Sequence, residues 1–430
     1  MKITMIHVPQ PQSIDDMLNP SISLLYLLGY VRRETDWETE YCELAGTKTR
    51  EEREERIPYA DVYGIEFYTC AYHLVEEIAE LCKIANPNAY VIVGGPHPSA
   101  LPEDAIKVPN VDTVFVGEAE KSLVDWLKHP HAGIVVSQIL TTEEMNDLPF
   151  PARDLVPPLP YTRTIEGNRC ADVWTSRVCP WECHFCFKTV TGKGVRYQSL
   201  ERTKDELAYL KDQGYNTFMF LDEVFTLKRK TRLYPLLDFM KDLDITFRNT
   251  CKPSYDKPED FIRLRAAGCD CIGTGTETGS DKILKAMNKG CTVKDNYETI
   301  QMVKDAGIIC RSYFIFGYPG EDERTIDETL EFIHKAKPDQ FSCFTFTPFP
   351  GNYVYNHPEE FGITWLSDDW NDYQMLQGTE GVGLMPFETK WMKREKALEL
   401  NKMFVKELWK IPQKGVLQTW ADKLDIVEKK

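Results

Sequence analysis

At 430 residues, the chain is long enough to build two or three domains, each with its own hydrophobic core. Hydrophobic residues make up 42% and charged residues 27%, as in ordinary globular proteins, and no apolar run of about eighteen residues occurs that could cross a membrane. The net charge of −16 argues against nucleic acid as the main partner, because phosphate binding requires basic surface.

The N-terminus and the cysteines indicate a cellular compartment. The apolar run before Pro9 is too short for a signal peptide, so we expect a buried first strand there. The 13 cysteines are odd in number, and three of them form a motif typical of metal binding. Together these features predict a reducing, cytoplasmic location.

The first 140 residues alternate apolar strands with amphipathic helices, the pattern of a parallel sheet covered on both faces. We predict helices over Ser23–Arg33 and Tyr72–Ala85. The predicted strands are Ile3–Val8, Thr39–Leu44, Val62–Tyr68, Tyr90–Gly94 and Thr113–Gly117. This order predicts a flavodoxin-like, Rossmann-type domain over residues 1–140, and such sheets bind ligands at the carboxyl ends of their strands.

Glycines follow two of these strands directly. Gly94 and Gly95 come after the fourth strand, just before His97, and Gly117 and Glu118 come after the fifth. Glycine lets the backbone approach a large ligand closely. A tight strand-to-helix turn uses the same residues, so the glycines alone leave both interpretations open.

Prolines change the composition of residues 141–170. They are Pro149, Pro151, Pro157, Pro158 and Pro160. Prolines favour an extended, semi-rigid chain. We therefore predict a linker over 141–170, followed by a second domain over 171–360.

A cysteine motif lies near the start of the second domain. Cys179, Cys183 and Cys186 have the spacing C-x3-C-x2-C, with Phe185 before the last cysteine. Three thiolates on one loop can hold three irons of a cubane [4Fe–4S] cluster and leave the fourth iron without a protein ligand. Zinc is the alternative, but zinc prefers four ligands in paired knuckles, and no second knuckle follows. The spacing therefore favours a catalytic iron–sulfur site.

Six strands are predicted in the second domain, and they alternate with helices. They are Val173–Ser176, Thr217–Leu221, Ile245–Asn249, Cys271–Thr274, Ile308–Phe316 and Phe341–Phe346. Six strands predict a partial, open (β/α)6 barrel of the TIM type, and in βα barrels the chemistry gathers at the carboxyl ends of the strands. The cysteine loop follows the first of these strands. Asp222 and Glu223 follow the second, where they could bind a cationic ammonium group or cap a helix.

Residues 361–430 are predicted to be a helical C-terminal extension. From Lys390 onward, 11 Lys and Arg residues stand against 6 Asp and Glu residues. An apolar stripe runs through this segment at Ala397, Leu400, Phe404 and Leu408. The stripe favours a helix packed across the barrel with a solvated lysine face, and a docking surface for an acidic partner is the alternative.

The cysteine loop and the G-x-E-[ST]-G-S segment around Glu277 resemble those of the radical S-adenosylmethionine (SAM) enzymes, over about residues 171–356. The resemblance implies that the open iron chelates SAM, with Phe185 beside the adenine. It also implies that electron transfer from the cluster cleaves SAM to a 5′-deoxyadenosyl radical. Asp222 and Glu223 would lie near the methionyl amino group, and Glu277 near the ribose and methionyl portion.

Residues 55–128 resemble the cobalamin-binding domain found ahead of many radical SAM domains, most clearly in Val91–Pro98 and Val116–Glu118. The motif D-x-H-x-x-G, whose histidine coordinates cobalt in many such domains, is absent. The resemblance therefore implies cobalamin bound without a histidine ligand, or a domain that has lost cobalamin. The residues it places near the corrin are Gly94, Gly95, His97, Gly117 and Glu118.

Together, the two resemblances imply a cobalamin-dependent radical SAM enzyme. Its expected chemistry is methylation of an unactivated carbon, or of phosphorus, through the 5′-deoxyadenosyl radical and methylcobalamin. The substrate would be a small molecule or a peptide. An external donor such as flavodoxin or ferredoxin would supply electrons.

Three alternatives are kept. An oxidative cyclase, a ring-contraction enzyme or a carbon–carbon coupling enzyme would use the same cofactors. A methylthiotransferase would need a second cysteine triad, and Cys42, Cys70 and Cys82 lack clear ligand loops. A non-enzymatic cobalamin sensor would have no use for the cysteine loop.

Overall fold

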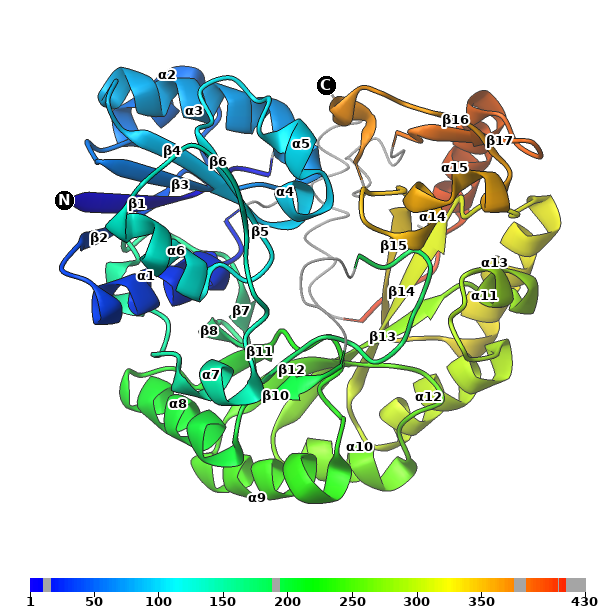
Figure 1. The fold of residues 1–430 in the computed structure, drawn as a ribbon. Coiled ribbons are helices and arrows are strands. Elements are labelled where there is room, and N and C mark those ends of the chain that lie inside the picture. Colours follow the sequence, from blue (N-terminus) through cyan, green and yellow to red (C-terminus); the bar gives the residue numbers. More distant parts are fainter. Residues whose placement is uncertain (11–16, 188–193, 375–383, 409, 415–430) are drawn as a thin grey trace.

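The computed structural model describes residues 1–10, 17–187, 194–374, 384–408 and 410–414. Figure 1 shows an N-terminal domain (blue to cyan) beside a curled sheet that carries its helices on the outer side (green to yellow). A smaller C-terminal part, in orange, follows the curled sheet. Within these ranges, every helix is too short or too polar to cross a bilayer.

The N-terminal sheet has six parallel strands in the order β2-β1-β3-β4-β5-β6. They are β1 (Lys2–His7), β2 (Glu38–Glu43), β3 (Val62–Glu66), β4 (Tyr90–Gly94), β5 (Thr113–Val116) and β6 (Gly133–Val136). The first five confirm the predicted strands and the flavodoxin-like order. β6 was not among the predicted strands, because this edge strand has only 4 residues and none of them is buried.

Helices cover both faces of this sheet. α1 (Ile22–Glu34) and α6 (Glu120–Lys128) pack on one face, and α3 (Tyr72–Ala85) packs on the other. Successive strand residues point to opposite faces, so Ile92 joins the first core and Val91 the second. The shorter helices are α2 (Arg50–Arg56), α4 (Pro96–Ala100) and α5 (Pro102–Ala105). Both predicted helices are confirmed.

The second sheet is a half-barrel in the order β15-β14-β13-β12-β11-β8-β7. Its parallel strands are β8 (Asn168–Val173), β11 (Thr217–Phe220), β12 (Thr246–Cys251), β13 (Cys269–Glu277), β14 (Ile309–Phe316) and β15 (Gln340–Thr345). The six parallel strands confirm the predicted partial barrel. The prediction for the first strand, Val173–Ser176, was displaced: β8 starts at Asn168, where it forms a hairpin with β7 (Thr164–Ile165), and ends at Val173.

Helices cover the outer side of the half-barrel (Figure 1). They are α8 (Leu200–Asp212), α9 (Tyr234–Leu243), α10 (Pro258–Ala266), α11 (Asp281–Ala286), α12 (Val293–Asp305) and α13 (Glu323–Ala336). α15 (Arg394–Leu408) packs beside α13, and the predicted apolar stripe of this helix is buried. The prediction of a helix packed across the barrel is therefore confirmed.

Two predicted segments contain more structure than expected. Residues 141–170 hold α7 (Thr142–Asp147) and the 3-10 turn η2 (Arg153–Leu155). The cause of α7 is local, because the Thr141 and Glu144 side chains form a capping box. In the C-terminal part, β16 (Ile363–Leu366) and β17 (Phe387–Thr389) pair as antiparallel strands ahead of α15.

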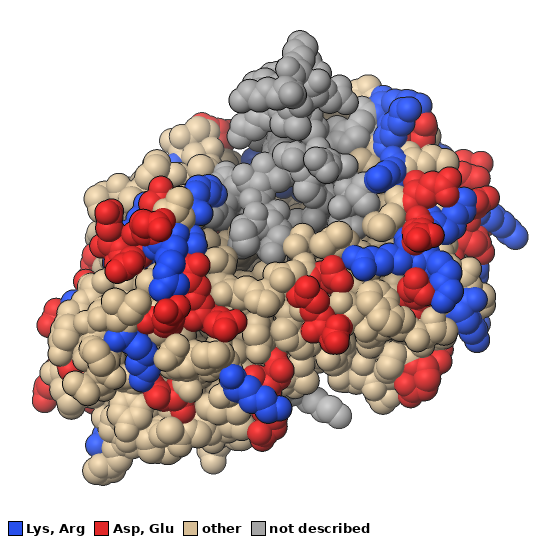
Figure 2. Space-filling view, turned by 90° about the horizontal axis from the view of Figure 1, so that it is seen from above, with Lys and Arg blue, Asp and Glu red and all other residues tan. Residues whose placement is uncertain are grey.

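Charged side chains of both signs are interspersed over the face seen in Figure 2. Elsewhere as well as on this face, charged residues of the described chain form exposed ion pairs; one is Lys282–Asp322, whose side chains are 57% and 53% exposed. Such pairs contribute little to stability. The apolar cores on the two sheets therefore hold the fold together.

Candidate active site between the two domains

A cavity of about 400 Å³ lies where the N-terminal sheet meets the half-barrel. On one side, it is lined by α1 and by the carboxyl ends of β3, β4 and β5. On the other side, the lining comes from segments that follow β8 and β11, namely Trp174, Ser176, Arg177, Phe187, Leu221 and Glu223. The carboxyl ends of both sheets, where ligands and chemistry are expected, thus face one space.

Glycines form part of the wall on the N-terminal side. Gly95 has φ of +115° and Gly117 has φ of +89°, a region that favours glycine. A Cβ on Gly95 would lie 3.1 Å from the carbonyl oxygen of Phe67. A Cβ on Gly94 would meet its nearest atom, in Phe115, only at 3.8 Å, so a side chain there fits but takes up space in the cavity. The glycines therefore serve both the turn and the open wall.

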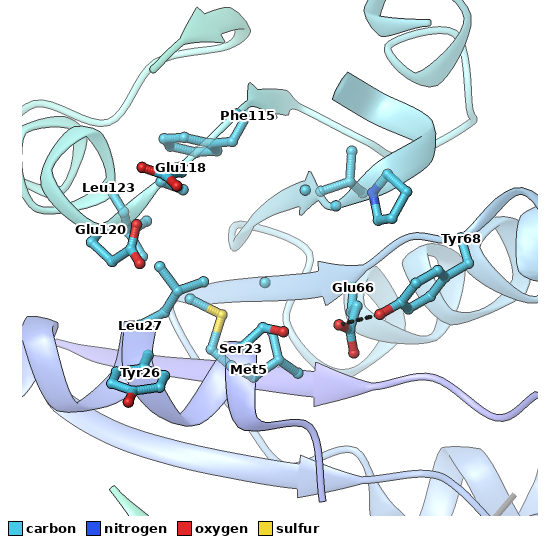
Figure 3. Close-up of a pocket in the computed structure, with 18 of the residues that line it drawn as sticks. Met5, Ser23, Tyr26, Leu27, Glu66, Tyr68, Phe115, Glu118, Glu120 and Leu123 are labelled. Carbon is cyan, nitrogen blue, oxygen red and sulfur yellow. Dashed lines mark hydrogen bonds between the residues drawn. The ribbon is translucent and has the colours of Figure 1, made fainter. Parts of the chain in front are cut away.

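Acidic side chains lie at two ends of the part of the cavity drawn in Figure 3. At one end, the Tyr68 hydroxyl donates to the Glu66 carboxylate at 3.0 Å. At the other end lie Glu118 and Glu120. The surface between them is mainly apolar, which suits a large ligand with few polar contacts.

His97 is not brought to the cavity. It lies in α4, is 1% exposed and stacks on Phe67 with ring centres 4.6 Å apart. Its Nδ1 is 3.0 Å from the Thr69 hydroxyl and its Nε2 is 3.1 Å from Asp104. Burial lowers the pKa of His97, against the opposing effect of Asp104. The structure therefore gives His97 a packing role, and among the described residues the cavity lining contains no histidine.

The cysteine loop lies between two short antiparallel strands. β9 (Ser176–Arg177) pairs antiparallel with β10 (Arg196–Tyr197), and Cys179, Cys183 and Cys186 follow β9, all half-buried. His184 turns to the C-terminal part, where its ring stacks on Tyr353 at 4.5 Å. In the described ranges, no three His, Cys, Asp or Glu side chains are grouped as a metal site. Ligation of a cluster by the three cysteines stays a prediction.

Phe185 and Glu277 are brought together by a lysine. Glu277, at the end of β13 with φ of +62°, forms a buried ion pair with Lys289 at 2.5 Å. The Lys289 Nζ lies 5.5 Å from the centre of the Phe185 ring. Burial lowers the pKa of Lys289, but the charge of Glu277 outweighs it and raises that pKa above its ordinary value. A fixed positive and a fixed negative charge thus lie beside the cysteine loop.

Asp222 and Glu223 have different surroundings. Asp222 is 2% exposed and accepts hydrogen bonds from the Thr175 amide at 3.2 Å and the Thr175 hydroxyl at 2.8 Å. Its carboxylate also lies 3.4 Å from Arg232. Burial raises the pKa of Asp222, with Arg232 acting in the opposite direction. Asp222 therefore fastens the segment before the cysteine loop, whereas Glu223 lines the cavity.

Several charged residues at the site escaped the sequence analysis. Arg177 and Arg196 flank the cysteine loop and pair with Glu118, while Arg177 also pairs with Glu120. Lys252 lies over the ring of Trp181, with Nζ 5.0 Å from the ring centre. A lysine just after a barrel strand was a usable signal for Lys252. The partners of the two arginines are distant in the sequence and left no local signal.

Two family models match the chain in the predicted order. The model of the B12 binding domain matches residues 17–127, and the model of the radical SAM superfamily matches residues 175–333. The chain belongs to the cobalamin-dependent radical SAM enzymes. Its cofactors are therefore a [4Fe–4S] cluster, SAM and cobalamin.

Relatives of this cobalamin-dependent radical SAM enzyme carry several names. An uncharacterized methyltransferase of Pyrococcus horikoshii is 28% identical, with 87% of each chain covered. Bacteriochlorophyllide d C-8(2)-methyltransferase of Chlorobaculum tepidum is 27% identical over 72% of this chain and 69% of its own length. The anaerobic magnesium-protoporphyrin IX monomethyl ester cyclase of Rubrivivax gelatinosus is 25% identical over 67% of this chain and 57% of its own.

A solved structure confirms the fold. The radical SAM methyltransferase TsrM from Kitasatospora setae, with cobalamin and a [4Fe–4S] cluster bound, superposes with a TM-score of 0.67 at 17% identity. The match covers 84% of this chain and 78% of that one. The arrangement of a B12-binding sheet domain against a radical SAM half-barrel is thus shared.

The residues present fit these cofactors. Gly94, Gly95 and Gly117 leave a wall that the corrin of cobalamin can approach closely. The three half-buried thiols on one loop suit the cluster. The Glu277–Lys289 pair offers one charge of each sign, as the carboxylate and ammonium of SAM require.

Proposed function

We propose that this enzyme is a methyltransferase that acts on an unactivated carbon, or on phosphorus, of a small-molecule or peptide substrate. One observation carries the proposal: a single cavity is lined by Gly94 and Gly95 of the sheet domain and by Arg177 and Phe187 near the cysteines. A methyl donor held at the sheet and a radical generated at the loop would both reach a substrate in this space. The names of two relatives as methyltransferases support the proposal.

When bound, the cluster and SAM supply a 5′-deoxyadenosyl radical, and cobalamin supplies methyl-transfer chemistry. The chain binds and orients these groups and excludes water. Glu277 and Lys289 would hold the two charged groups of the methionyl portion of SAM, with Phe185 beside the adenine. Asp222 and Glu223 were both predicted to lie near the methionyl amino group of SAM. Glu223 lines the cavity and Asp222 does not, so we assign this role to Glu223 alone. Electrons would come from an external donor such as flavodoxin or ferredoxin.

Labelled SAM tests the reaction class. The enzyme, loaded with iron–sulfur cluster and hydroxocobalamin and reduced, is incubated with SAM carrying a CD₃ group and with small-molecule or peptide extracts. Methyl transfer predicts a product that gains the label, together with 5′-deoxyadenosine and S-adenosylhomocysteine in a ratio of about one to one. A Cys179→Ala variant serves as the control and should form no 5′-deoxyadenosine.

A radical cyclase, or a ring-contraction or coupling enzyme, is the second candidate. The relative named as a cyclase favours it, because that protein is 25% identical over 67% of this chain. This reaction would give product and 5′-deoxyadenosine without S-adenosylhomocysteine and without label. Such a result would reject methyl transfer and leave the assignment of the cofactors intact.

A further inference from the structure

One carboxylate fastens both ends of the cysteine loop to the wall of the cavity. Arg196, in β10 after the loop, donates to both carboxylate oxygens of Glu118, each at 2.7 Å. Arg177, in β9 before the loop, lies 3.2 Å from Glu118 and 2.7 Å from Glu120. Glu118 and Glu120 belong to the sheet domain, so these ion pairs cross from one domain to the other.

The ion pairs are buried. The side chains of Glu118 and Glu120 are 4% and 7% exposed, and those of Arg177 and Arg196 are 14% and 11% exposed. Burial raises the pKa of Glu118, but the hydrogen bond from Arg196 and the charges of both arginines outweigh it and hold that pKa below its ordinary value. Glu118 is therefore ionised at neutral pH, and a buried two-pronged arginine–carboxylate contact fixes geometry strongly.

The same carboxylate also belongs to the cavity wall. Glu118 follows Gly117 directly, lines the cavity and accepts a hydrogen bond from the Leu140 amide at 2.9 Å. Arg196 in turn donates to the Leu140 carbonyl at 2.6 Å. A ligand that fills the cavity would therefore contact Glu118, the carboxylate that binds an arginine at each end of the loop.

We propose that Glu118 is a positioning residue that couples occupancy of the cobalamin cavity to the placement of the cysteine loop. The sequence analysis expected Glu118 to contact cobalamin, whereas its carboxylate is directed to the two arginines. The coupling sets how the cobalamin site and the cluster site face each other. It rests on the cofactors of the family and not on methyl transfer, so it can be tested without turnover.

Amide hydrogen exchange of the full chain tests this coupling, with hydroxocobalamin as the probe. In the unchanged protein, hydroxocobalamin should slow exchange by about tenfold in residues 174–187 and 194–199. Glu118→Gln keeps the shape of the side chain but loses the charge that both arginines require. At a hydroxocobalamin concentration that saturates this variant, exchange in those segments should show no slowing.

Glu144→Gln is the matched control, because Glu144 forms an exposed ion pair with Lys121 in the same part of the chain. It should leave the slowing unchanged. Arg196→Lys keeps the charge and loses the two-pronged contact, so it should retain part of the slowing even if Glu118→Gln folds poorly. Full slowing in both Glu118→Gln and Arg196→Lys would overturn the coupling. Loss of hydroxocobalamin binding in Glu118→Gln, with the ligand-free loop unchanged, would also overturn it and make Glu118 a direct cobalamin contact.

Discussion

The carboxyl edges of the two sheets meet at one cavity, yet they are built by opposite means. On the N-terminal sheet, Gly94, Gly95 and Gly117 leave part of the wall without side chains. On the half-barrel, charged side chains are buried in pairs, as in Glu277 with Lys289. A large macrocycle is accommodated by removing side chains, whereas a small charged ligand is held by fixed charges. The first edge should therefore be sensitive to added bulk and the second to a removed charge.

The largest effect is expected when the three thiols at the carboxyl edge of the half-barrel are removed. Replacing Cys179, Cys183 and Cys186 by Ala should abolish iron binding and cleavage of SAM, because these thiols are the predicted protein ligands of the cluster. The fold should persist, since none of the three belongs to an apolar core. Iron content and 5′-deoxyadenosine formation measure the effect. Cys291→Ala, a half-buried thiol outside the motif, is the control and should keep its iron.

Removing one charge of the buried Glu277–Lys289 pair should have a smaller effect. Lys289→Met leaves the Glu277 carboxylate buried without its partner and should lower the free energy of unfolding by about 3 kcal/mol. Denaturant unfolding measures this change. Lys282→Met removes a lysine from an exposed ion pair nearby and should cost less than about 1 kcal/mol. Equal losses in the two variants would contradict the importance of burial at this edge.

Larger side chains at Gly94 and Gly95 test the carboxyl edge of the N-terminal sheet. Gly94→Leu should weaken hydroxocobalamin binding by about tenfold or more while the iron–sulfur spectrum is kept, because the new side chain occupies the cavity. Gly95→Val is a less direct test, since its Cβ would also press on the Phe67 backbone. Val136→Leu adds bulk on the exposed face of β6 and is the control. Unchanged affinity in Gly94→Leu would place cobalamin elsewhere.

A pH-dependent effect is expected from Glu321, an acid buried on the half-barrel side. Burial raises the pKa of Glu321 to about 8, while its ordinary value is 4.5, so the folded state favours the neutral form. The free energy of unfolding should therefore fall as the pH rises from 4.5 towards 8. Glu321→Gln should remove this fall, so its gain in the free energy of unfolding over the unchanged protein should be absent below pH 4.5 and should grow steadily up to pH 8.

Thermal unfolding across this pH range measures the effect. The Gly317 amide donates to Glu321, and glutamine can accept the same hydrogen bond. Glu323→Gln, on the exposed side of α13, is the control and should show no growing gain with pH. A gain that is equal at pH 5 and pH 8 would show that the effect does not come from titration.

The sequence determined the local features of this protein. Alternating apolar segments predicted five strands of the first sheet and six of the half-barrel, because strand formation depends on the burial pattern of neighbouring residues. The motif spacing predicted the cysteine loop, and the resemblance of the segments after β4 and β5 to cobalamin-binding domains predicted a ligand edge. These features are encoded within a few residues, so they can be read without the fold. The short edge strand β6 and the helix α7 were missed, since neither has a long enough pattern.

Only the tertiary structure decided what the charged groups do. Glu118 pairs with Arg196, 78 residues away, and Arg177 pairs with Glu120, 57 residues away. Asp222 and His97 were predicted to contact a cofactor. In the structure, Asp222 accepts a hydrogen bond from Thr175, and His97 is packed against Phe67. A carboxylate or an imidazole has the same local sequence signature whether it meets a cofactor or a distant side chain. The packing of the two domains determines which partner it finds, because ion pairs depend on distance in space and not on separation along the chain.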